Sequence, residues 1–447
     1  MTDALVWHRL QFAFTIVFHY LFPQLTMGLA ALIALMKITA AVTKDERWAA
    51  AARFWIRVFA VNFAFGVVTG IPMEMQFGTN WSRFTGFAGA VIGHSLGMES
   101  LFAFFLESVF LGMLVFGEKK LGPRRHLAVS LLLWLGTWAS GFFIVTVNAF
   151  MQHPRGHVVR ADGTLAMGDF VAYMTNPWAL AELAHVLSAS LVTASFVVSS
   201  VGAYYTLLGR HREHAPLFLR IGVRVGVAAS LLVAFPTGDH QAKLVAEHQP
   251  VALAAMEGRF ETERAAGITL IGQPNVRARR LDNPVVVPAM LSFLAYGTFH
   301  SDVRGLAEFP ERDWPTNIEL LYYSFHLMAG IGTIQIALMA AAAAFELRRR
   351  LDRARPLLWA LLLAAPLPYI ATTAGWLTAE LGRQPWLIFG VFRTADGASP
   401  RVHSGDALFT LIGFAGIYAV LALLFVVLVG RIVGRGPSAE AEEASHG

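Results

Sequence analysis

An apolar segment near residues 92–117 contains two glutamates, Glu99 and Glu107, in the stretch GMESLFAFFLES. A carboxylate is costly inside a membrane-spanning helix, so its presence there usually indicates a function. Eight residues of α-helix separate the two side chains by about 80° around the axis and about 12 Å along it. Both can therefore line one inward stripe at two depths. The pattern favours a proton-conducting pair or a carboxylate beside a metal; the alternative is a pair of structural carboxylates hydrogen-bonded to neighbouring helices.

Three side chains of other apolar segments could bind haem iron. His19 lies in TIVFHYLFP, His185 in AELAHVLSAS and Met328 in SFHLMAGIG. A neutral imidazole and a thioether are suitable axial ligands, and the small residues beside His185 and Met328 would let a flat macrocycle approach the helix. Taken singly, each has an alternative as a core residue, and packing is the better interpretation of Met328 alone. The other histidines without such neighbours are interpreted as structural: His94, His126 and His326.

A further group follows the eighth apolar segment, in AGWLTAELGRQPWLIFG. Glu380 precedes Arg383 by three residues and lies at the expected membrane edge. Its carboxylate could ligate a metal, and the guanidinium could pair with a haem propionate. An interfacial anchor of Trp, Arg and Pro residues explains the same pattern, and the residues alone do not decide between the two.

Helices in a membrane must position these groups. Hydrophobic residues make up 56% of the 447 residues and charged residues 15%, against about 45–50% and about 25% in ordinary globular chains. The chain is too apolar to cover its core with polar surface, which predicts an integral membrane protein and disfavours a nucleic-acid partner. The net charge of +5 is expected to come from cytoplasmic loops. Because the chain has no cysteine, disulfides, iron–sulfur clusters and c-type haem attachment are excluded.

Apolar stretches of spanning length predict an all-α fold with about nine transmembrane helices. They lie near 11–36, 54–75, 92–117, 127–150, 180–207, 217–235, 319–345, 356–379 and 407–432. Lys and Arg residues concentrate in alternate connections, which the positive-inside rule assigns to the cytoplasm. The N-terminus is then expected outside and the C-terminus inside, with a cytoplasmic tail from 434 to 447.

One connection is exceptionally long. Residues 236–318 separate the first six helices (1–235) from the last three (319–433), on the side predicted to be outside. The stretch from Ala246 to Glu263 has helical composition, and proline-containing turns follow. A connection of this length is usually functional or disordered.

Together these segments resemble subunit I of the cytochrome bd-type quinol oxidases along nearly the whole chain. The matching stretches are FHYLFPQLTMG, ESLFAFFLES, the surroundings of His185, SFHLMAG, and GRQPW with the preceding Glu380. The combination of GRQPW with the double-glutamate segment is specific to that family.

The resemblance implies three haems near the outer face. His185 and Met328 match the two axial ligands of a low-spin haem b. His19 and Glu380 match the axial ligands of two high-spin haems, one b and the other d or b. It further implies that Glu99 lies beside the high-spin pair and that Glu107 belongs to a proton path from the cytoplasm. By the same resemblance, Trp376 lies between haems and Arg383 lies near haem propionates.

The resemblance also makes the long connection a quinol-binding loop of the short class. Glu257 in LAAMEGRFET matches the glutamate of the quinol site. The lysine that commonly precedes it by five residues is Ala252 here, so this chain departs from the family pattern at that position.

The implied function is that of a quinol:oxygen oxidoreductase in the bacterial cytoplasmic membrane. Quinol is expected to be oxidised at the outer face and dioxygen reduced to water with cytoplasmic protons, which makes the reaction electrogenic without a pump. The implied partners are a second multi-span subunit and a single-span small one. Two alternatives remain: a transporter with a proton relay, which predicts no chromophore, and a haem b anchor, which predicts low-spin haem alone.

Overall fold

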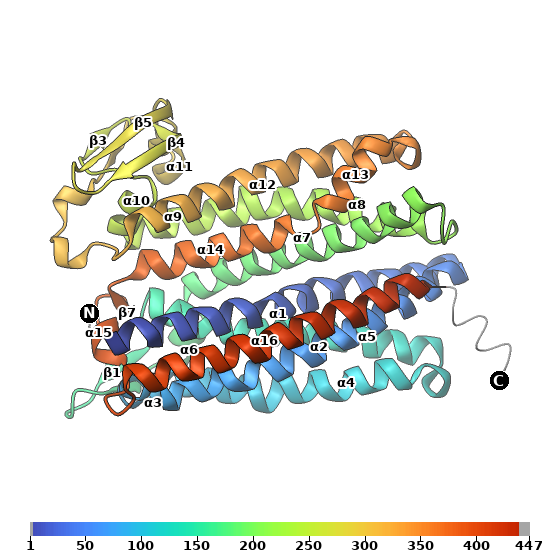
Figure 1. Ribbon diagram of the computed structural model, residues 1–447, viewed down its shortest axis with the longest axis horizontal. Coiled ribbons are helices and arrows are strands. Elements are labelled where there is room, and N and C mark those ends of the chain that lie inside the picture. The colour runs from blue at the N-terminus through green and yellow to red at the C-terminus, as the bar shows by residue number, and fades with distance from the viewer. Residues whose placement is uncertain (1–2, 438–447) are drawn as a thin grey trace.

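Nine long helices run side by side along the molecule in the computed structural model, which describes residues 3–437 (Figure 1). Each is long and apolar enough to cross a bilayer, because about 20 apolar residues cover a hydrocarbon core of about 30 Å. Within the described part of the chain the nine spans are Ala4–Thr43, Glu46–Thr79, Ser82–Phe116, Glu118–Gln152, Phe170–Leu208, Ala215–His248, Ile318–Leu347, Arg355–Arg383 and Ser404–Arg435. The expected all-α membrane fold is confirmed.

Five spans are each assigned as one helix, the fourth of the nine with a kink at Gly122. These are α1 (Asp3–Thr43), α2 (Glu46–Thr79), α5 (Glu118–Gln152), α12 (Ile318–Leu347) and α16 (Ser404–Arg435). The others contain breaks. The third span consists of α3 (Ser82–Met98), a π-helical segment η1 (Glu99–Phe104) and α4 (Phe105–Phe116), and the sixth of α8 (Ala215–Leu232), a π-helical segment η2 (Val233–Gly238) and α9 (Asp239–His248). The fifth span consists of α6 (Phe170–Met174) and α7 (Pro177–Leu208), and the eighth of α13 (Arg355–Leu363) and α14 (Leu367–Arg383).

The sixth span is longer than the sequence predicts. The polar composition from residue 236 onward predicts a loop, but the helix continues through Pro236 and ends only at His248. The π-helical segment η2 contains this proline, and such a segment is a common way for a helix to accommodate an irregular residue. The long connection therefore begins at residue 249, and residues 236–248 belong to the helical bundle.

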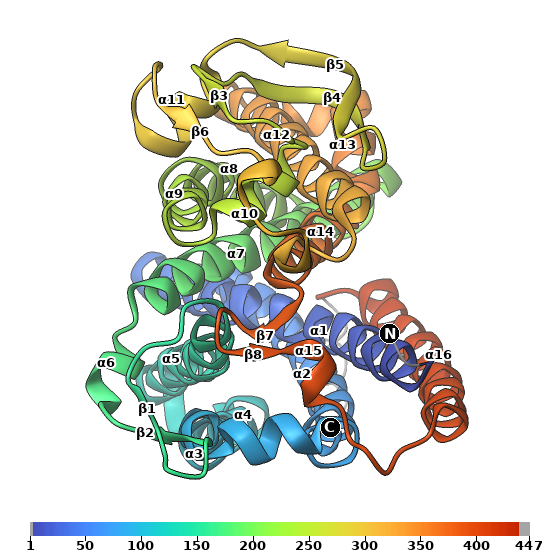
Figure 2. The same cartoon turned by 90° about the vertical axis from the view of Figure 1, so that its left-hand side faces the viewer.

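The connection 249–317 is a folded cap at one end of the bundle (Figure 2). Its helices and turns are α10 (Pro250–Met256), α11 (Met290–Tyr296), η3 (Leu306–Glu308) and η4 (Glu311–Asp313). Its strands form two antiparallel pairs, β4 (Ile268–Asn275) with β5 (Arg280–Val287) and β3 (Glu263–Arg264) with β6 (Asp302–Val303). We call this end of the bundle the loop side.

Smaller elements complete the two ends. The N-terminal end of α1 also lies at the loop side, with the hairpins β1 (His157–Val159)–β2 (Leu165–Met167) and β7 (Trp386–Ile388)–β8 (Phe392–Arg393) and the short α15 (Thr394–Gly397). The opposite end, the basic side, has short connections and η5 (Leu351–Arg353). The clustered lysines and arginines of the sequence lie in and next to these short connections.

Helix α1 occupies the middle of the bundle, against α2, α5, α7 and α16 (Figure 2). It approaches α7 closely at Gly28, where an added methyl group would overlap the backbone carbonyl of Ser190. Nearby, the amide of Gln24 donates to Thr193 at 3.0 Å and to Thr372 at 3.1 Å, which ties α1 to both α7 and α14. Small residues and interhelical hydrogen bonds of this kind hold helices together where lipid supplies no hydrophobic drive.

Candidate functional site

The π-helical segment η1 changes the relation between Glu99 and Glu107. Glu99 is its first residue and Glu107 follows three residues after its end. A π-helical turn contains one residue more than an α-helical turn. The eight residues from Glu99 to Glu107 therefore rotate about the helix axis by about as much as seven residues of regular α-helix. Seven steps amount to within about 20° of two full turns. The expectation of about 80° is therefore wrong, and the two side chains are closer to one face than the sequence predicts.

Both carboxylates face helix α5. Ser140 donates a hydrogen bond to Oε1 of Glu99 at 2.9 Å. The Glu107 side chain is 5% exposed, and its Cγ would lie 3.3 Å from a methyl group added at Gly136. Because Gly136 and Ser140 are one helical turn apart, the two glutamates face α5 at successive turns.

His19 is oriented from one ring nitrogen only. Its Nδ1 lies 3.1 Å from the hydroxyl of Thr69 on α2, and that hydroxyl donates to the carbonyl of Phe65 at 2.8 Å. Thr69 can thus accept from Nδ1–H while it donates to the backbone. Within residues 3–437 the opposite nitrogen, Nε2, makes no hydrogen bond, which is the state expected of an imidazole that binds a metal through Nε2. Gly70 lies beside the ring, and an added methyl group there would be 3.0 Å from its Cε1.

His185 shows the same arrangement on α7. Its Nδ1 lies 3.3 Å from the hydroxyl of Thr237, a residue of the π-helical segment η2. Gly238 follows, and an added methyl group there would lie 3.5 Å from Cε1 of the imidazole. The irregular turn thus places a hydroxyl and a glycine against the ring, while Nε2 is again without a partner among the described residues.

Met328 faces α14 at a glycine. A methyl group added at Gly375 would lie 2.9 Å from the sulfur of Met328. Trp376 is the next residue along α14, and Glu380 follows one turn later. The thioether, the indole and the carboxylate are therefore carried by one pair of helices, α12 and α14, which pack along their length.

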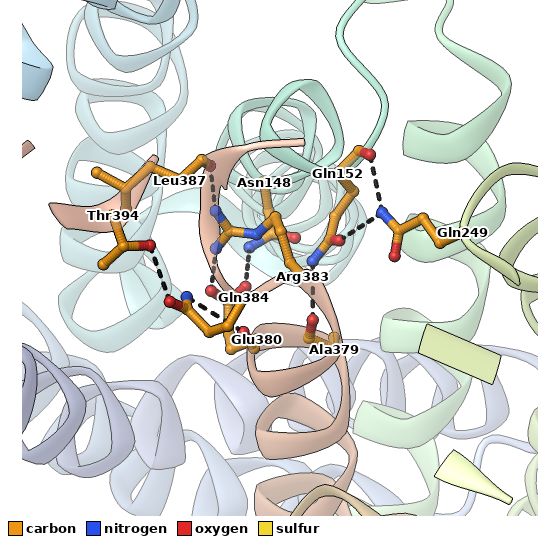
Figure 3. A network of polar contacts seen from close by, with 9 residues as sticks. All are labelled: Asn148, Gln152, Gln249, Ala379, Glu380, Arg383, Gln384, Leu387 and Thr394. Atoms are coloured by element: carbon orange, nitrogen blue, oxygen red, sulfur yellow. Dashed lines mark hydrogen bonds and ion pairs between the residues drawn. The ribbon is translucent and has the colours of Figure 1, made fainter. Parts of the chain in front are cut away.

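Glu380 lies in a buried polar network at the loop side (Figure 3). Its Oε1 accepts a hydrogen bond from the amide of Asn148 on α5 at 2.7 Å, and its Oε2 pairs with the guanidinium of Arg383. Arg383 also donates to the carbonyl of Leu387 and is 2% exposed, whereas the side chain of Glu380 is 38% exposed. The carboxylate is thus held in place and still accessible to a further ligand.

The network continues from α14 to the start of the cap. Gln152, one turn beyond Asn148 on α5, donates to the carbonyl of Ala379 at 3.2 Å. Gln249 donates to the backbone and side-chain oxygens of Gln152 at 2.8 and 3.0 Å. Figure 3 shows these side chains in sequence between the cap and α14. Helix α5 thus contacts Glu107, Glu99, Glu380 and the cap in that order along its length, through Gly136, Ser140, Asn148 and Gln152.

Several buried polar atoms around this network have no partner among the described residues. One is Nε of Arg383, a donor without an acceptor. A second is Oδ1 of Asn148, and both oxygens of Glu182 are further examples; Glu182 lies on α7 three residues before His185 and is 6% exposed. Unpaired buried polar groups are costly, so the region suits a polar group of a bound molecule. Glu182 was overlooked in the sequence, although it is a charged residue within the fifth apolar segment.

These observations fit haem. Two imidazoles are oriented through Nδ1 and free at Nε2, a thioether and a carboxylate are available, and a buried arginine has a donor for an anionic propionate. Glycines stand beside three of the four candidate ligands, where a side chain would occupy the space next to the ligand: Gly70, Gly238 and Gly375. The four candidate ligands come from four different helices, which explains why no local sequence motif unites them.

Glu257 lies apart from these residues, at the end of α10 in the cap. It is 1% exposed. Burial raises its pKa to about 7, against smaller opposite effects from the backbone of Thr269 and the charge of Arg259. Strand β4 is fixed beside it by His326, whose ring nitrogens lie 2.8 Å from the carbonyl oxygen of Tyr322 and 2.9 Å from that of Thr269. The contacts of His326 are structural, as its sequence context suggests.

Ala252, where the family commonly has lysine, is 1% exposed on α10. Its methyl group lies near Gly382 of α14. A Cβ atom added at Gly382 would be 3.4 Å from the Ala252 methyl carbon. In this chain the position therefore packs the cap against the bundle and contributes no charge to the surroundings of Glu257.

Comparisons with known proteins agree along the whole chain. Residues 7–437 match the family model for cytochrome bd terminal oxidase subunit I. The chain is 36% identical to cytochrome bd ubiquinol oxidase subunit 1 of Bacillus subtilis, with 99% of this chain and 96% of the relative covered. It is 31% identical to cytochrome bd-II ubiquinol oxidase subunit 1 of Escherichia coli, with 99% of each covered.

A solved structure agrees as well. The bd oxidase of Geobacillus thermodenitrificans superposes with a TM-score of 0.90 at 31% identity, over 97% of this chain and 99% of the other. The apolar spans, the two imidazoles oriented through Nδ1 and these full-length matches lead to one conclusion. The chain belongs to the cytochrome bd terminal oxidase subunit I family, whose members are subunits of membrane-bound quinol:oxygen oxidoreductases.

Proposed function

We propose that this chain is the haem-bearing catalytic subunit of its oxidase and that His185 and Met328 are the axial ligands of a low-spin haem b. The observation that carries the proposal is the pair of half-buried histidines, each oriented through Nδ1 with Nε2 free and a glycine beside the ring. When bound, haem would supply one-electron transfer and oxygen binding. Arg383 would pair with a propionate through its unpartnered Nε, and Trp376 would lie between haems.

His19 and Glu380 would be the axial ligands of two high-spin haems, one b and the third d or b. The role of Asn148 and Arg383 is to fix the Glu380 carboxylate, one oxygen each. Such outer contacts orient a ligand and adjust its basicity. Glu99 would lie beside this pair, held by Ser140.

Protons would reach the site from the basic side of the bundle. Glu107 lies closer to that end of the third span than Glu99, and the π-helical segment brings both carboxyls toward α5. A proton passed from Glu107 to Glu99 along this face would be delivered where oxygen is reduced. The excess of Lys and Arg makes the basic side cytoplasmic, which places the N-terminus outside and the C-terminus inside.

Quinol would be oxidised in the cap, on the outer side. Quinol loses two electrons and two protons to become quinone, and Glu257 would accept one of the protons. A base with a pKa near the working pH is suited to this task, and burial raises the pKa of Glu257 to about 7. Protons released outside and taken up inside make the reaction electrogenic without a pump. The Bacillus subtilis and Escherichia coli relatives named above are ubiquinol oxidases, and a membrane quinol is the proposed substrate.

The oxidase family works with a second multi-span subunit in the bacterial cytoplasmic membrane. A single-span small subunit would complete the assembly. With no cysteine in the chain, contacts on this subunit's side would be noncovalent.

One optical measurement tests the proposal. Reduced-minus-oxidised spectra of the purified complex, repeated with carbon monoxide, should show a low-spin haem and carbon-monoxide-binding high-spin haems, together with quinol-dependent oxygen uptake. A transporter with a proton relay would show no chromophore. A haem b anchor would show only the low-spin signal and no oxygen uptake.

A further inference from the structure

Four buried polar atoms near Glu257 have no hydrogen-bond partner among the described residues. They are Oε2 of Glu257, Oγ1 of Thr269, the hydroxyl of Tyr322 and Nε of Arg259. The first three residues are 1%, 2% and 1% exposed. Native proteins rarely leave such atoms unpaired, so four in one region indicate a place for a molecule that the chain itself does not supply.

Contacts between the elements bring these atoms together. The ring of His326 stacks on the ring of Tyr322 with centroids 3.9 Å apart and binds the carbonyl of Thr269 at 2.9 Å. A methyl group added at Gly258, next to Glu257, would lie 3.3 Å from the Tyr322 ring. Tyr322 is also within electrostatic reach of Glu257 and Arg259. Helix α12, strand β4 and the end of α10 thus each contribute a residue with an unpartnered polar atom to one buried region, which is called the niche below.

The surface beside this niche is apolar. Large aliphatic side chains of the β4–β5 hairpin are exposed next to Thr269, which pairs with Val286 across the strands. They are Leu270, Ile271, Val285, Val286 and Val287. An exposed apolar patch at the end of a transmembrane bundle suits contact with lipid. A ligand of the niche is therefore expected to combine a polar head with an apolar body and to arrive from the membrane.

We propose that Tyr322, together with Thr269, binds the same quinol oxygen whose proton Glu257 accepts. This inference rests on the proposed function of Glu257 and adds two residues that no sequence motif identifies. The phenol O–H of Tyr322 and the hydroxyl of Thr269 donate to the ring oxygen while its own O–H donates to Glu257. After two electrons and two protons have left, the same two donors hold the carbonyl oxygen of the quinone.

The position of Tyr322 on α12 supports this role. It precedes Met328 by six residues, about 9 Å along the helix axis. A quinol head bound at Tyr322 would therefore lie one to two helical turns from the proposed low-spin ligand. The neighbouring Tyr323, by contrast, is 48% exposed.

The test compares Tyr322→Phe with Tyr323→Phe in the complete, haem-loaded complex. Tyr322→Phe removes one hydroxyl and keeps the ring that stacks on His326. With ubiquinol-1 as substrate, KM should rise about five- to tenfold, as expected for one lost hydrogen bond, with a smaller change in kcat. Equilibrium dialysis with ubiquinone-1 should show a similar loss of affinity. The haem spectrum should not change, and Tyr323→Phe should behave as wild type.

Thr269→Val, which replaces the hydroxyl by a methyl group, should weaken binding in the same assays. The double variant Glu257→Gln/Tyr322→Phe should lose less than the two single losses combined, because both residues hold one oxygen. Wild-type KM and ubiquinone-1 affinity in Tyr322→Phe and Thr269→Val would overturn the inference and leave the niche to an internal water molecule. If Glu257→Gln also retains wild-type binding and turnover, the proposed quinol site at Glu257 fails as well.

Discussion

Asn148 and Glu380 are joined by a 2.7 Å hydrogen bond between helices α5 and α14. The amide holds one carboxylate oxygen while Arg383 holds the other. Neither residue alone identifies a site, but together they show a carboxylate fixed on two sides with more than a third of its side chain still exposed. This geometry is consistent with the proposed role of Glu380 as a haem ligand.

Asn148→Ala should therefore disturb the high-spin haems and leave the low-spin haem in place. The loss of one orienting contact outside a metal's ligands typically costs about 10- to 100-fold in affinity or activity. Gln152→Ala is the matched control, since Gln152 lies one turn further on α5 and donates to a backbone carbonyl of α14, not to the carboxylate. Haem content and spectra with carbon monoxide give the answer; equal spectra in both variants would contradict a ligand role for Glu380.

Met328→Leu should remove the low-spin haem signal while the protein still folds. The exchange nearly conserves volume and costs less than about 1.5 kcal/mol in a core, but it removes the thioether that faces Gly375. The reduced-minus-oxidised spectrum of the purified variant is the measurement. An unchanged low-spin signal would remove Met328 from the set of ligands.

Glu107→Ala and Glu99→Ala should differ. Glu107 is nearer the basic side and touches no proposed ligand, so its loss should slow oxygen reduction by about tenfold or more through slower proton delivery, with intact spectra. Glu99→Ala should in addition change the high-spin spectra. The two variants are compared in haem content, spectra and oxygen uptake. Normal turnover in both, or haem loss in Glu107→Ala, would favour structural carboxylates.

Glu257→Gln should impair quinol oxidation without changing the haem spectrum, and it should alter the pH profile. Burial raises the pKa of Glu257 to about 7, so below that pH the carboxyl is mostly protonated and cannot accept a proton. Wild-type kcat/KM for quinol should rise as pH increases through about 7 and then level off. The glutamine variant should be slow and lack this rise; a wild-type pH profile would exclude Glu257 as the proton acceptor.

Gly28→Ala should destabilise the bundle by about 1–3 kcal/mol, the usual range for overpacking a core. An added methyl group would overlap the carbonyl of Ser190, where α1 and α7 meet. Gly413→Ala on α16 is the control, because nothing lies within 4 Å of its added methyl group. Thermal unfolding in detergent, followed by far-UV circular dichroism, compares the two. Equal melting temperatures would show that α1 and α7 adjust easily.

The nine spans follow from the sequence alone, because about 20 apolar residues in lipid can satisfy their backbone only as a helix. The same reasoning singled out Glu99, Glu107, His19 and His185, since polar groups inside a membrane are rare and costly. This reasoning does not single out Met328 or Glu257. A lone methionine and a loop glutamate carry no physical signal of their own, and only the family resemblance marked them.

The tertiary structure decided how these groups meet. The apolar periodicity does not mark the π-helical segments, so the sequence predicted an offset of about 80° between Glu99 and Glu107 and did not predict the extension of the sixth helix to His248. Tyr322 and Asn148 likewise reveal their roles only through partners on other elements, on α10 and β4 for one and on α14 for the other. Periodicity predicts which residues lie in the membrane; the contacts between distant segments determine which of them share a site.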